Sequence, residues 1–262
     1  MSDIRLVCGE CSEVMRGMPC DSVDLILTSP PYDQLREYHG YAFDFPAIAA
    51  QLYRVLKPGG VIVWVVGDQT KDGSESGTSF RQALHFMSLG LNLHDTMIYE
   101  AAGTGAKGSR LSYWQGFEYM FVLSKSKPKT INLLRDRPNT KRPGTIQSTR
   151  RRREGGEMRV PEYFEVSLLG NRTNIWRYAT GHGHSFCENH PAPFPEALAR
   201  DHILSWSNPG DLVLDPFVGS GTTAKQCVLL ERNCIGIDIS TEYIALAQRR
   251  VEQAQMQIRM PL

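Results

Sequence analysis

The chain contains no long hydrophobic run. None of its apolar stretches approaches the roughly 20 residues needed to cross a bilayer, and the longest purely apolar run, at 61–66, has the length of a buried strand. The first residues, Met1 to Arg5, do not have the pattern of a signal peptide. We therefore expect a cytoplasmic protein without a membrane partner, whose 262 residues form one large domain, with or without an insertion.

Cysteine is too sparse in a chain of this length for a disulfide framework. Cys8 and Cys11 have the spacing of metal ligands, and further candidate ligands follow much later, at His182, His184, Cys187 and His190. The later set lies in a glycine-containing loop before a proline-rich turn, and Cys20 supplies no second pair. We therefore expect no metal site.

Net positive charge is confined to one segment. Residues 125–159 contain twelve basic and three acidic residues, a net charge of +9, so the remainder carries −8 against a total of +1. Such a segment predicts a polyanionic partner that one part of the molecule binds. The alternative is a solvated, flexible basic loop.

Short apolar runs alternate with stretches of helical periodicity on both sides of this segment. The pattern predicts strands at 4–7, 23–27, 61–66, 93–99, 117–123, 211–215 and 234–238, and helices at 12–18, 44–56, 80–89, 195–205, 222–230 and 240–251. This alternation is typical of a doubly wound α/β fold with a mostly parallel sheet. In the segment that separates the two groups of elements, prolines, glycines and basic residues dominate. We therefore divide the chain into a first part at 1–123, an insertion at 124–186 and a second part at 187–262.

The strand expected at 23–27 ends abruptly in Thr28-Ser29-Pro30-Pro31-Tyr32. The two prolines fix the backbone and lack N–H groups, so they make a stiff exit from the sheet. Ser29, two backbone carbonyls and the Tyr32 ring are then presented at the carboxyl end of a strand, where open α/β sheets bind ligands. This group suits a planar, amine-bearing base taken out of a helix. The alternative is a strand that ends in a simple proline turn.

A second motif follows the strand expected at 211–215. Glycines in Gly219-Ser220-Gly221 allow the backbone to approach a ligand, and the helix that begins at Thr222 favours an anionic group. About twenty residues on, Asp238 ends the next strand and can accept hydrogen bonds from ribose hydroxyls. No Gly-Lys-Ser/Thr follows, which argues against a P-loop. The pattern predicts a nucleoside cofactor, and a plain structural turn is the alternative.

Together, Thr28-Ser29-Pro30-Pro31-Tyr32 and Asp215-Pro216-Phe217-Val218-Gly219-Ser220-Gly221-Thr222-Thr223 resemble the catalytic and cofactor motifs of the S-adenosylmethionine-dependent DNA amino-methyltransferases. The catalytic motif comes first, and this order is similar to the circularly permuted β class. The resemblance implies a Rossmann-like methyltransferase with a target-recognition insertion. Cys8-Gly9-Glu10-Cys11 also resembles the family segment near the cofactor adenine, which gives those cysteines a role other than metal binding. The implied cofactor-binding residues are Glu10, Cys11, Thr28, Asp215, Phe217, Gly219, Ser220, Gly221, Thr222 and Asp238.

The catalytic residues that the resemblance implies have a chemical rationale. An exocyclic amine of a base is a poor nucleophile, because its lone pair is conjugated into the ring. The Ser29 side chain and the Pro30 carbonyl would accept the N–H groups and free that lone pair, while Pro31 holds the turn. Tyr32 would stack on the flipped base, a contact worth about 1–3 kcal/mol. Positioning then supplies most of the acceleration.

The residue before the prolines bears on the target base. In this family Ser-Pro-Pro-Tyr usually accompanies cytosine N4, whereas Asp or Asn at that position usually accompanies adenine N6. Ser29 therefore predicts methylation of the N4 amine of a flipped cytosine in DNA. The alternatives are an N6-adenine methyltransferase and, from a different class, a non-catalytic DNA-binding protein that retains the fold.

Two other methyltransferase classes fit less well. Cytosine C5 methylation requires a Cys nucleophile, but Pro19-Cys20 precedes the strand rather than ending it. Glutamine methyltransferases have a similar turn with Asn before the prolines, and their cofactor motif lies earlier in the chain.

Double-stranded DNA is the partner that these observations predict. Phosphate contacts are expected from basic residues of the insertion, namely Lys141, Arg142, Arg150, Arg151, Arg152 and Arg153. Asn174 and Trp176 are candidates for reading bases, although core packing would equally explain Trp176. The family resemblance adds three expectations: a homodimer, a restriction-modification context, and a cognate endonuclease acting on the same site.

Overall fold

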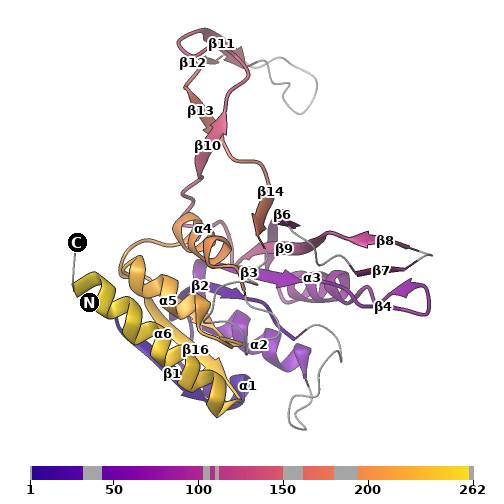
Figure 1. Ribbon diagram of the computed structural model, residues 1–262, viewed down its shortest axis with the longest axis vertical. Coiled ribbons are helices and arrows are strands. Elements are labelled where there is room, and N and C mark those ends of the chain that lie inside the picture. Colours follow the sequence, from indigo (N-terminus) through magenta and orange to yellow (C-terminus); the bar gives the residue numbers. More distant parts are fainter. Residues whose placement is uncertain are drawn as a thin grey trace. The chain divides into compact units, whose positions relative to one another are not determined.

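The computed structural model describes residues 2–31, 43–102, 107–109, 112–149, 162–179 and 194–259 (Figure 1). The chain divides into two compact units. Unit 1 comprises Met1–Asn132 and Asn174–Leu262, and unit 2 comprises Leu133–Thr173. No described helix has the length and apolar composition needed to span a membrane.

Unit 1 is built on an eight-stranded sheet with the order β1-β16-β15-β2-β3-β9-β6-β14. The strands are β1 (Ile4–Cys8), β2 (Val23–Thr28), β3 (Leu56–Val66), β6 (Asn92–Ala102), β9 (Phe117–Ser124), β14 (Ile175–Ala179), β15 (Leu212–Asp215) and β16 (Asn233–Asp238). Among these strands β9 alone runs antiparallel to its neighbours, β3 and β6. The mostly parallel α/β sheet expected from the sequence is confirmed.

Six helices in the described residues cover the two faces of this sheet (Figure 1). They are α1 (Cys11–Arg16), α2 (Phe45–Val55), α3 (Thr78–Ser88), α4 (Glu196–Trp206), α5 (Thr222–Leu229) and α6 (Thr241–Arg259). Helices α1 to α3 bury residues such as Met15, Leu52 and Phe86 in one cluster with Ile26 and Trp64 of the sheet. Helix α5 contacts both α4 and α6 on the other face. The central strands β2 and β3 are almost fully buried, as expected for strands covered on both faces.

Strand β3 is longer than the sequence predicts, because it begins at Leu56 and includes residues 57–60, which lie between the predicted helix at 44–56 and the predicted strand at 61–66. Its pairing with β2 shifts register between Val23 and Leu25. Gly59 has φ +82°, and a Cβ on Gly60 would lie 3.0 Å from the Asp24 carbonyl oxygen. The two glycines therefore let the chain bend within the strand instead of leaving it.

Two short hairpins lie outside the central sheet. One pairs β4 (Thr70–Lys71) with β5 (Ser74–Glu75), and the other pairs β7 (Lys107–Ser109) with β8 (Ser112–Gln115). The first lies between the predicted strand at 61–66 and the predicted helix at 80–89, where no strand was predicted. Asp72 and Gly73 both have positive φ, and Asp-Gly at this position is the signal of a tight hairpin turn.

Unit 2 is a narrow, two-stranded arm. Strand β10 (Arg135–Pro138) pairs with β13 (Leu169–Asn171), and β11 (Ile146–Thr149) pairs with β12 (Glu162–Glu165), all antiparallel. Every residue of β10 and β12 is exposed, so the arm has little core of its own.

The central sheet includes part of the segment that the sequence assigns to the insertion. Strand β14 pairs in parallel with β6, and Trp176 is buried within it. At the other end Lys125 donates to Asp21 and to the carbonyls of Tyr53 and Leu56. The compact arm therefore spans Leu133–Thr173, inside the expected limits of 124–186. Trp176 packs against His202 with ring centroids 4.5 Å apart, which favours the core-packing explanation of this residue.

Candidate active site

The two sequence motifs meet where β2 and β15 end side by side. These strands are parallel neighbours, with Val213 opposite Leu25 and Leu214 opposite Ile26. The turns that follow these two strands therefore leave the sheet at the same edge. At that edge the Thr28 hydroxyl donates to Asp215 Oδ1 over 2.7 Å, and both side chains are buried. The structure thus brings together two segments that the insertion separates in sequence.

Ser29, Pro30 and Pro31 follow β2 directly at this edge. Pro30 is buried, whereas Ser29 and Pro31 are partly exposed. Tyr32, the predicted stacking residue, lies outside the described residues.

The Asp215 carboxylate accepts hydrogen bonds from several groups. Besides the Thr28 hydroxyl, the backbone N–H of Phe217 donates to Asp215 Oδ1 over 3.1 Å. Burial raises the pKa of the Asp215 carboxyl to about 6, although hydrogen bonds from Thr223 and Thr28 oppose that shift. Phe217 lies two residues after Asp215, and its ring centroid is 6.4 Å from that of Trp64. Asp215 therefore joins the two strand ends from inside the protein.

The glycine loop and Asp238 are adjacent, as the sequence predicts. The Gly219 N–H donates to Asp238 Oδ2 over 3.0 Å, and the Ser240 N–H donates to Asp238 Oδ1 over 2.8 Å. Gly219 and Gly221 have φ of +49° and +83°, which favours glycine at both positions. Burial raises the pKa of Asp238, although the group stays partly exposed. A carboxylate with two backbone donors and remaining lone pairs suits the diol of a nucleoside.

The Ser220 and Thr222 side chains were expected to bind the cofactor, but they bond to Arg250. Both side chains are buried, and both accept hydrogen bonds from Arg250 Nη1, over 2.9 Å at Ser220 Oγ and 3.1 Å at Thr222 Oγ1. Arg250 lies on α6 and was not among the predicted residues. The sequence did contain a signal for Arg250: it is a basic residue on the same helix face as Ala247, Val251 and Ala254, which are buried.

Glu10 and Cys11 lie close to Asp238 through the pairing of β1 with β16. The Gly9 N–H donates to the Asp238 carbonyl over 2.9 Å. Glu10 is the N-cap of α1 and accepts from the backbone N–H groups of Ser12 and Glu13. Burial opposes its ionisation, but hydrogen bonds from the Ser12 hydroxyl and from these backbone groups outweigh it and lower the Glu10 pKa. The Cys11 thiol is buried, and burial raises its pKa, so it is not a reactive thiolate.

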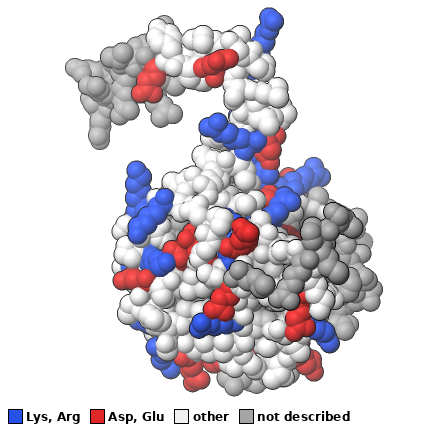
Figure 2. All heavy atoms as spheres, turned by 90° about the vertical axis from the view of Figure 1, so that its left-hand side faces the viewer, with Lys and Arg blue, Asp and Glu red and all other residues white. Residues whose placement is uncertain are grey.

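The predicted DNA contacts are partly described. Lys141 and Arg142 are exposed on unit 2, and Lys141 Nζ donates to Gln147 Oε1 over 2.5 Å. In Figure 2 basic side chains are interspersed with acidic ones on the face shown. Arg150, Arg151, Arg152 and Arg153 lie outside the described residues, as do His182, His184, Cys187 and His190. The Asn174 side chain donates to the Thr96 carbonyl and so supports the central sheet.

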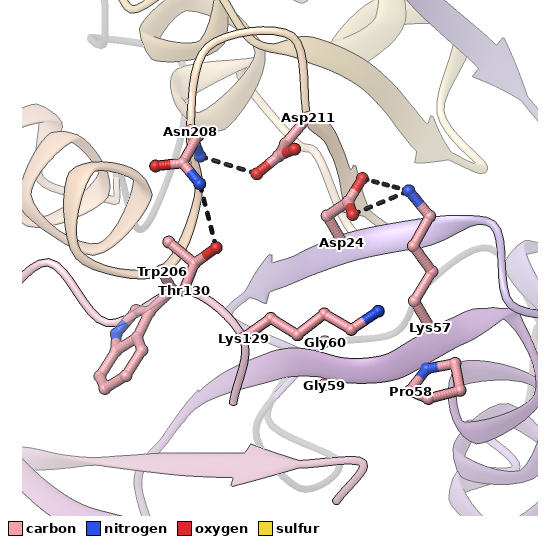
Figure 3. A pocket seen from close by; sticks show the side chains of 10 residues that line it. All are labelled: Asp24, Lys57, Pro58, Gly59, Gly60, Lys129, Thr130, Trp206, Asn208 and Asp211. Atoms are coloured by element: carbon pink, nitrogen blue, oxygen red, sulfur yellow. Dashed lines mark hydrogen bonds and ion pairs between the residues drawn. The ribbon is translucent and has the colours of Figure 1, made fainter. Parts of the chain in front are cut away.

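A cavity lies at the opposite edge of the sheet, where β2, β3 and β15 begin (Figure 3). Its lining includes Asp24, Lys57, Lys129 and Asp211. Lys57 Nζ donates to both Asp24 oxygens over 2.7 Å, and the Leu212 N–H donates to Asp24 Oδ2. These contacts tie the three strands together at their amino ends, so we assign them a structural role.

An open α/β sheet with a glycine loop, a strand-end acid and a Ser-Pro-Pro turn at one edge defines an enzyme with a nucleoside-type cofactor. The family model for DNA methylases of the N6 and N4 type matches residues 23–249. The chain belongs to this family of DNA amino-methyltransferases, which confirms the resemblance carried by the two motifs.

One relative is similar in sequence, and two solved structures are similar in fold. The chain is 53% identical to the orphan methyltransferase M.BamHII of Bacillus amyloliquefaciens over 237 residues, which cover 88% of this chain and 89% of the relative. The structure of the cytosine-N4-specific PvuII DNA methyltransferase matches with TM-score 0.73 at 20% identity, covering 98% of this chain and 93% of that one. The complex of a DNA modification methylase from Thermus thermophilus with S-adenosyl-L-methionine matches with TM-score 0.64 at 23% identity, covering 95% and 93%.

Proposed function

We propose that this enzyme transfers a methyl group from S-adenosylmethionine to the N4 amine of a cytosine flipped out of double-stranded DNA. The observation that carries the proposal is the position of Ser29 and Pro30 at the end of β2, one strand away from the glycine loop after β15. When bound, the cofactor supplies an electrophilic methyl group. The acceptor residues and the cofactor loop are held at one edge, as the reaction requires.

The catalytic part of the proposal concerns the amine. The Ser29 hydroxyl and the Pro30 carbonyl accept its N–H groups and draw the nitrogen towards tetrahedral geometry. Pro31 keeps these acceptors in place because its ring fixes the turn. Tyr32 is proposed to stack on the base. No covalent intermediate on the enzyme is required.

The cofactor part of the proposal assigns Asp238 to the ribose hydroxyls and the backbone of Gly219–Gly221 to close approach. Glu10, Cys11 and Phe217 form the neighbouring walls of this site. Thr28, Asp215, Ser220 and Thr222 act from inside the protein, because their side chains bond to one another or to Arg250. The donor set fits a nucleoside with a free diol.

The choice of cytosine rests on Ser29 within the Ser-Pro-Pro-Tyr motif. The fold similarity to a methyltransferase named cytosine-N4-specific is in keeping with it. N6-adenine is the alternative base, since the family includes both types.

Residues 124–186 are proposed to recognise the target, with the arm of unit 2 as the element that meets DNA. A two-stranded ribbon is narrow enough to enter the major groove. Lys141, Arg142 and the run Arg150, Arg151, Arg152 and Arg153 are proposed to bind phosphates, which orient the protein without reading the sequence.

A second copy of the chain is the proposed partner of α3. Phe80, Leu84 and Met87 are exposed by 48%, 64% and 43% and lie at helical spacing on one face. Light scattering should give a dimer mass for the wild type and a monomer mass for Leu84→Lys. Ile258→Lys, which changes an exposed residue of α6, is the control. We also propose a restriction-modification context with an endonuclease that cuts the same site.

The test of the proposed function is methyl transfer from labelled S-adenosylmethionine to bacterial DNA, followed by nucleoside digestion and mass analysis. N4-methylcytosine is the expected product. N6-methyladenine would replace the proposed base and keep the class of enzyme. Cofactor binding without any label in DNA or in RNA would favour a non-catalytic DNA-binding protein.

A further inference from the structure

Arg250 holds the cofactor loop from behind. The side chain is 4% exposed, and its Nη1 donates to the Ser220 carbonyl over 2.8 Å as well as to Ser220 Oγ and Thr222 Oγ1. One nitrogen of the guanidinium therefore bonds both to the central residue of the loop and to the first residue of α5.

The other terminal nitrogen of Arg250 reaches a different helix. Nη2 donates to Glu196 Oε1 over 2.8 Å, and Lys225 Nζ donates to the same oxygen over 2.7 Å. Glu196 is the first residue of α4, and Lys225 lies on α5. Burial opposes ionisation of Glu196, but hydrogen bonds from Lys225 and Arg250 outweigh it and lower the Glu196 pKa. The carboxylate thus stays charged and supplies the counterion that a buried guanidinium needs.

Close packing reinforces this arrangement. Gly221 has φ +83°, and a Cβ on it would lie 2.6 Å from Ala247 Cβ on α6. The backbone of the loop therefore rests directly on the helix that carries Arg250. The planar guanidinium has donors in fixed directions, so it can bond to the loop and to Glu196 at the same time.

We propose that Arg250 is a positioning residue for the cofactor, held in turn by Glu196, and that the pair sets the affinity for S-adenosylmethionine. The inference rests on the proposed function, because it takes the loop at 219–221 as the cofactor site. Arg250 does not contact the cofactor. Arg250 fixes the loop at 219–221 in the conformation in which the loop backbone can approach the cofactor.

Isothermal titration of S-adenosylmethionine into the wild type and four purified full-length variants tests this inference. The variants are Arg250→Met, Arg250→Lys and Glu196→Gln, with Arg249→Met as the matched control because Arg249 is the exposed neighbour on α6. We expect Arg250→Met to raise the Kd about tenfold or more, since charge-assisted hydrogen bonds are lost, with partial recovery in Arg250→Lys. Arg249→Met should stay within about twofold of the wild type.

Steady-state kinetics separate positioning from general damage. The KM for S-adenosylmethionine should rise in Arg250→Met, while the KM for DNA and the kcat at saturating cofactor change little. An unchanged cofactor Kd in a folded Arg250→Met protein, whether or not its Tm falls, would overturn the inference. If Arg250→Met does not fold, Glu196→Gln decides, because it keeps the shape of the side chain: a raised Kd supports the inference and an unchanged Kd refutes it.

Measurements on the wild-type protein distinguish failure of the proposed function from failure of the proposed role of Arg250. Failure of the wild-type protein to bind S-adenosylmethionine would refute the proposed function itself. Binding and methyl transfer by the wild type, with equal binding by Arg250→Met, would refute only the role of Arg250.

Discussion

The Thr28 hydroxyl donates a 2.7 Å hydrogen bond to Asp215 Oδ1, across 187 positions of sequence. Thr28 ends the strand before the Ser-Pro-Pro turn, and Asp215 ends the strand before the glycine loop. Both side chains are buried. The bond therefore fixes the relative position of the two segments on which the proposed reaction depends.

Thr28→Val should weaken both folding and methyl transfer. The change keeps the shape of the side chain but leaves a buried carboxylate with one donor fewer, at a cost of about 1–3 kcal/mol in the free energy of unfolding. Urea denaturation measures this loss, and initial rates measure the fall in kcat. Thr28→Ser keeps the hydroxyl and should lie close to the wild type. Equal stability of Thr28→Val and wild type would contradict the importance of the bond.

The stability of the protein should depend on Asp215 between about pH 4 and pH 6. The pKa of this carboxyl is raised to about 6 in the folded state, so the folded protein holds its proton more tightly than the unfolded chain does. The free energy of unfolding should thus fall as the pH rises through this window. The contribution is about 3 kcal/mol at most, from about 1.4 kcal/mol per pKa unit.

Asp215→Asn removes this titration. Urea denaturation at several pH values should give a flatter dependence for Asp215→Asn than for wild type, and the difference between the two proteins isolates this group from Asp238, whose pKa is also raised. Parallel curves for the two proteins would mean that Asp215 does not titrate in this range.

Ser29→Ala should separate chemistry from cofactor binding. Loss of the hydroxyl removes one acceptor of the amine, and we expect kcat to fall about a hundredfold, as when a single stabilising group is removed from other active sites. The Kd for S-adenosylmethionine should be unchanged, because the glycine loop is intact. Ser88→Ala, which removes a hydroxyl of α3, is the control. A normal kcat in Ser29→Ala would remove Ser29 from the catalytic group.

Replacing Arg150, Arg151, Arg152 and Arg153 by Ala should weaken DNA binding and its dependence on salt. Each phosphate contact contributes about −0.9 to the slope of log K against log salt concentration. Fluorescence anisotropy over a salt series measures this slope, and cofactor titration serves as the control for folding. A slope equal to that of the wild type would show that these arginines do not meet phosphates.

The sequence predicts the central strands well because they are buried on both faces and read as short apolar runs. Two further segments, Thr28–Pro31 and Asp215–Thr223, could also be identified from the sequence. Each is a short contiguous motif, the first marked by its prolines and the second by an acid followed by glycines. β14 was not predicted, because it is a short edge strand in which Arg177 and Tyr178 interrupt the apolar pattern. Arg250 and Glu196 were missed for another reason: their roles arise from contacts between the consecutive helices α4, α5 and α6, which no local sequence pattern shows.

The two residues that flank the arm in sequence, Asn132 and Asn174, form side-chain hydrogen bonds within unit 1. Asn132 Nδ2 donates to the carbonyls of Leu204 and Ser207, and Asn174 Nδ2 donates to the Thr96 carbonyl. We therefore expect changes in length and composition between these two asparagines to leave the strands of the central sheet in place. Together with the proposed function, this implies a modular enzyme, in which an arm taken from a relative would redirect methylation to a new DNA sequence and leave the catalytic and cofactor residues as they are.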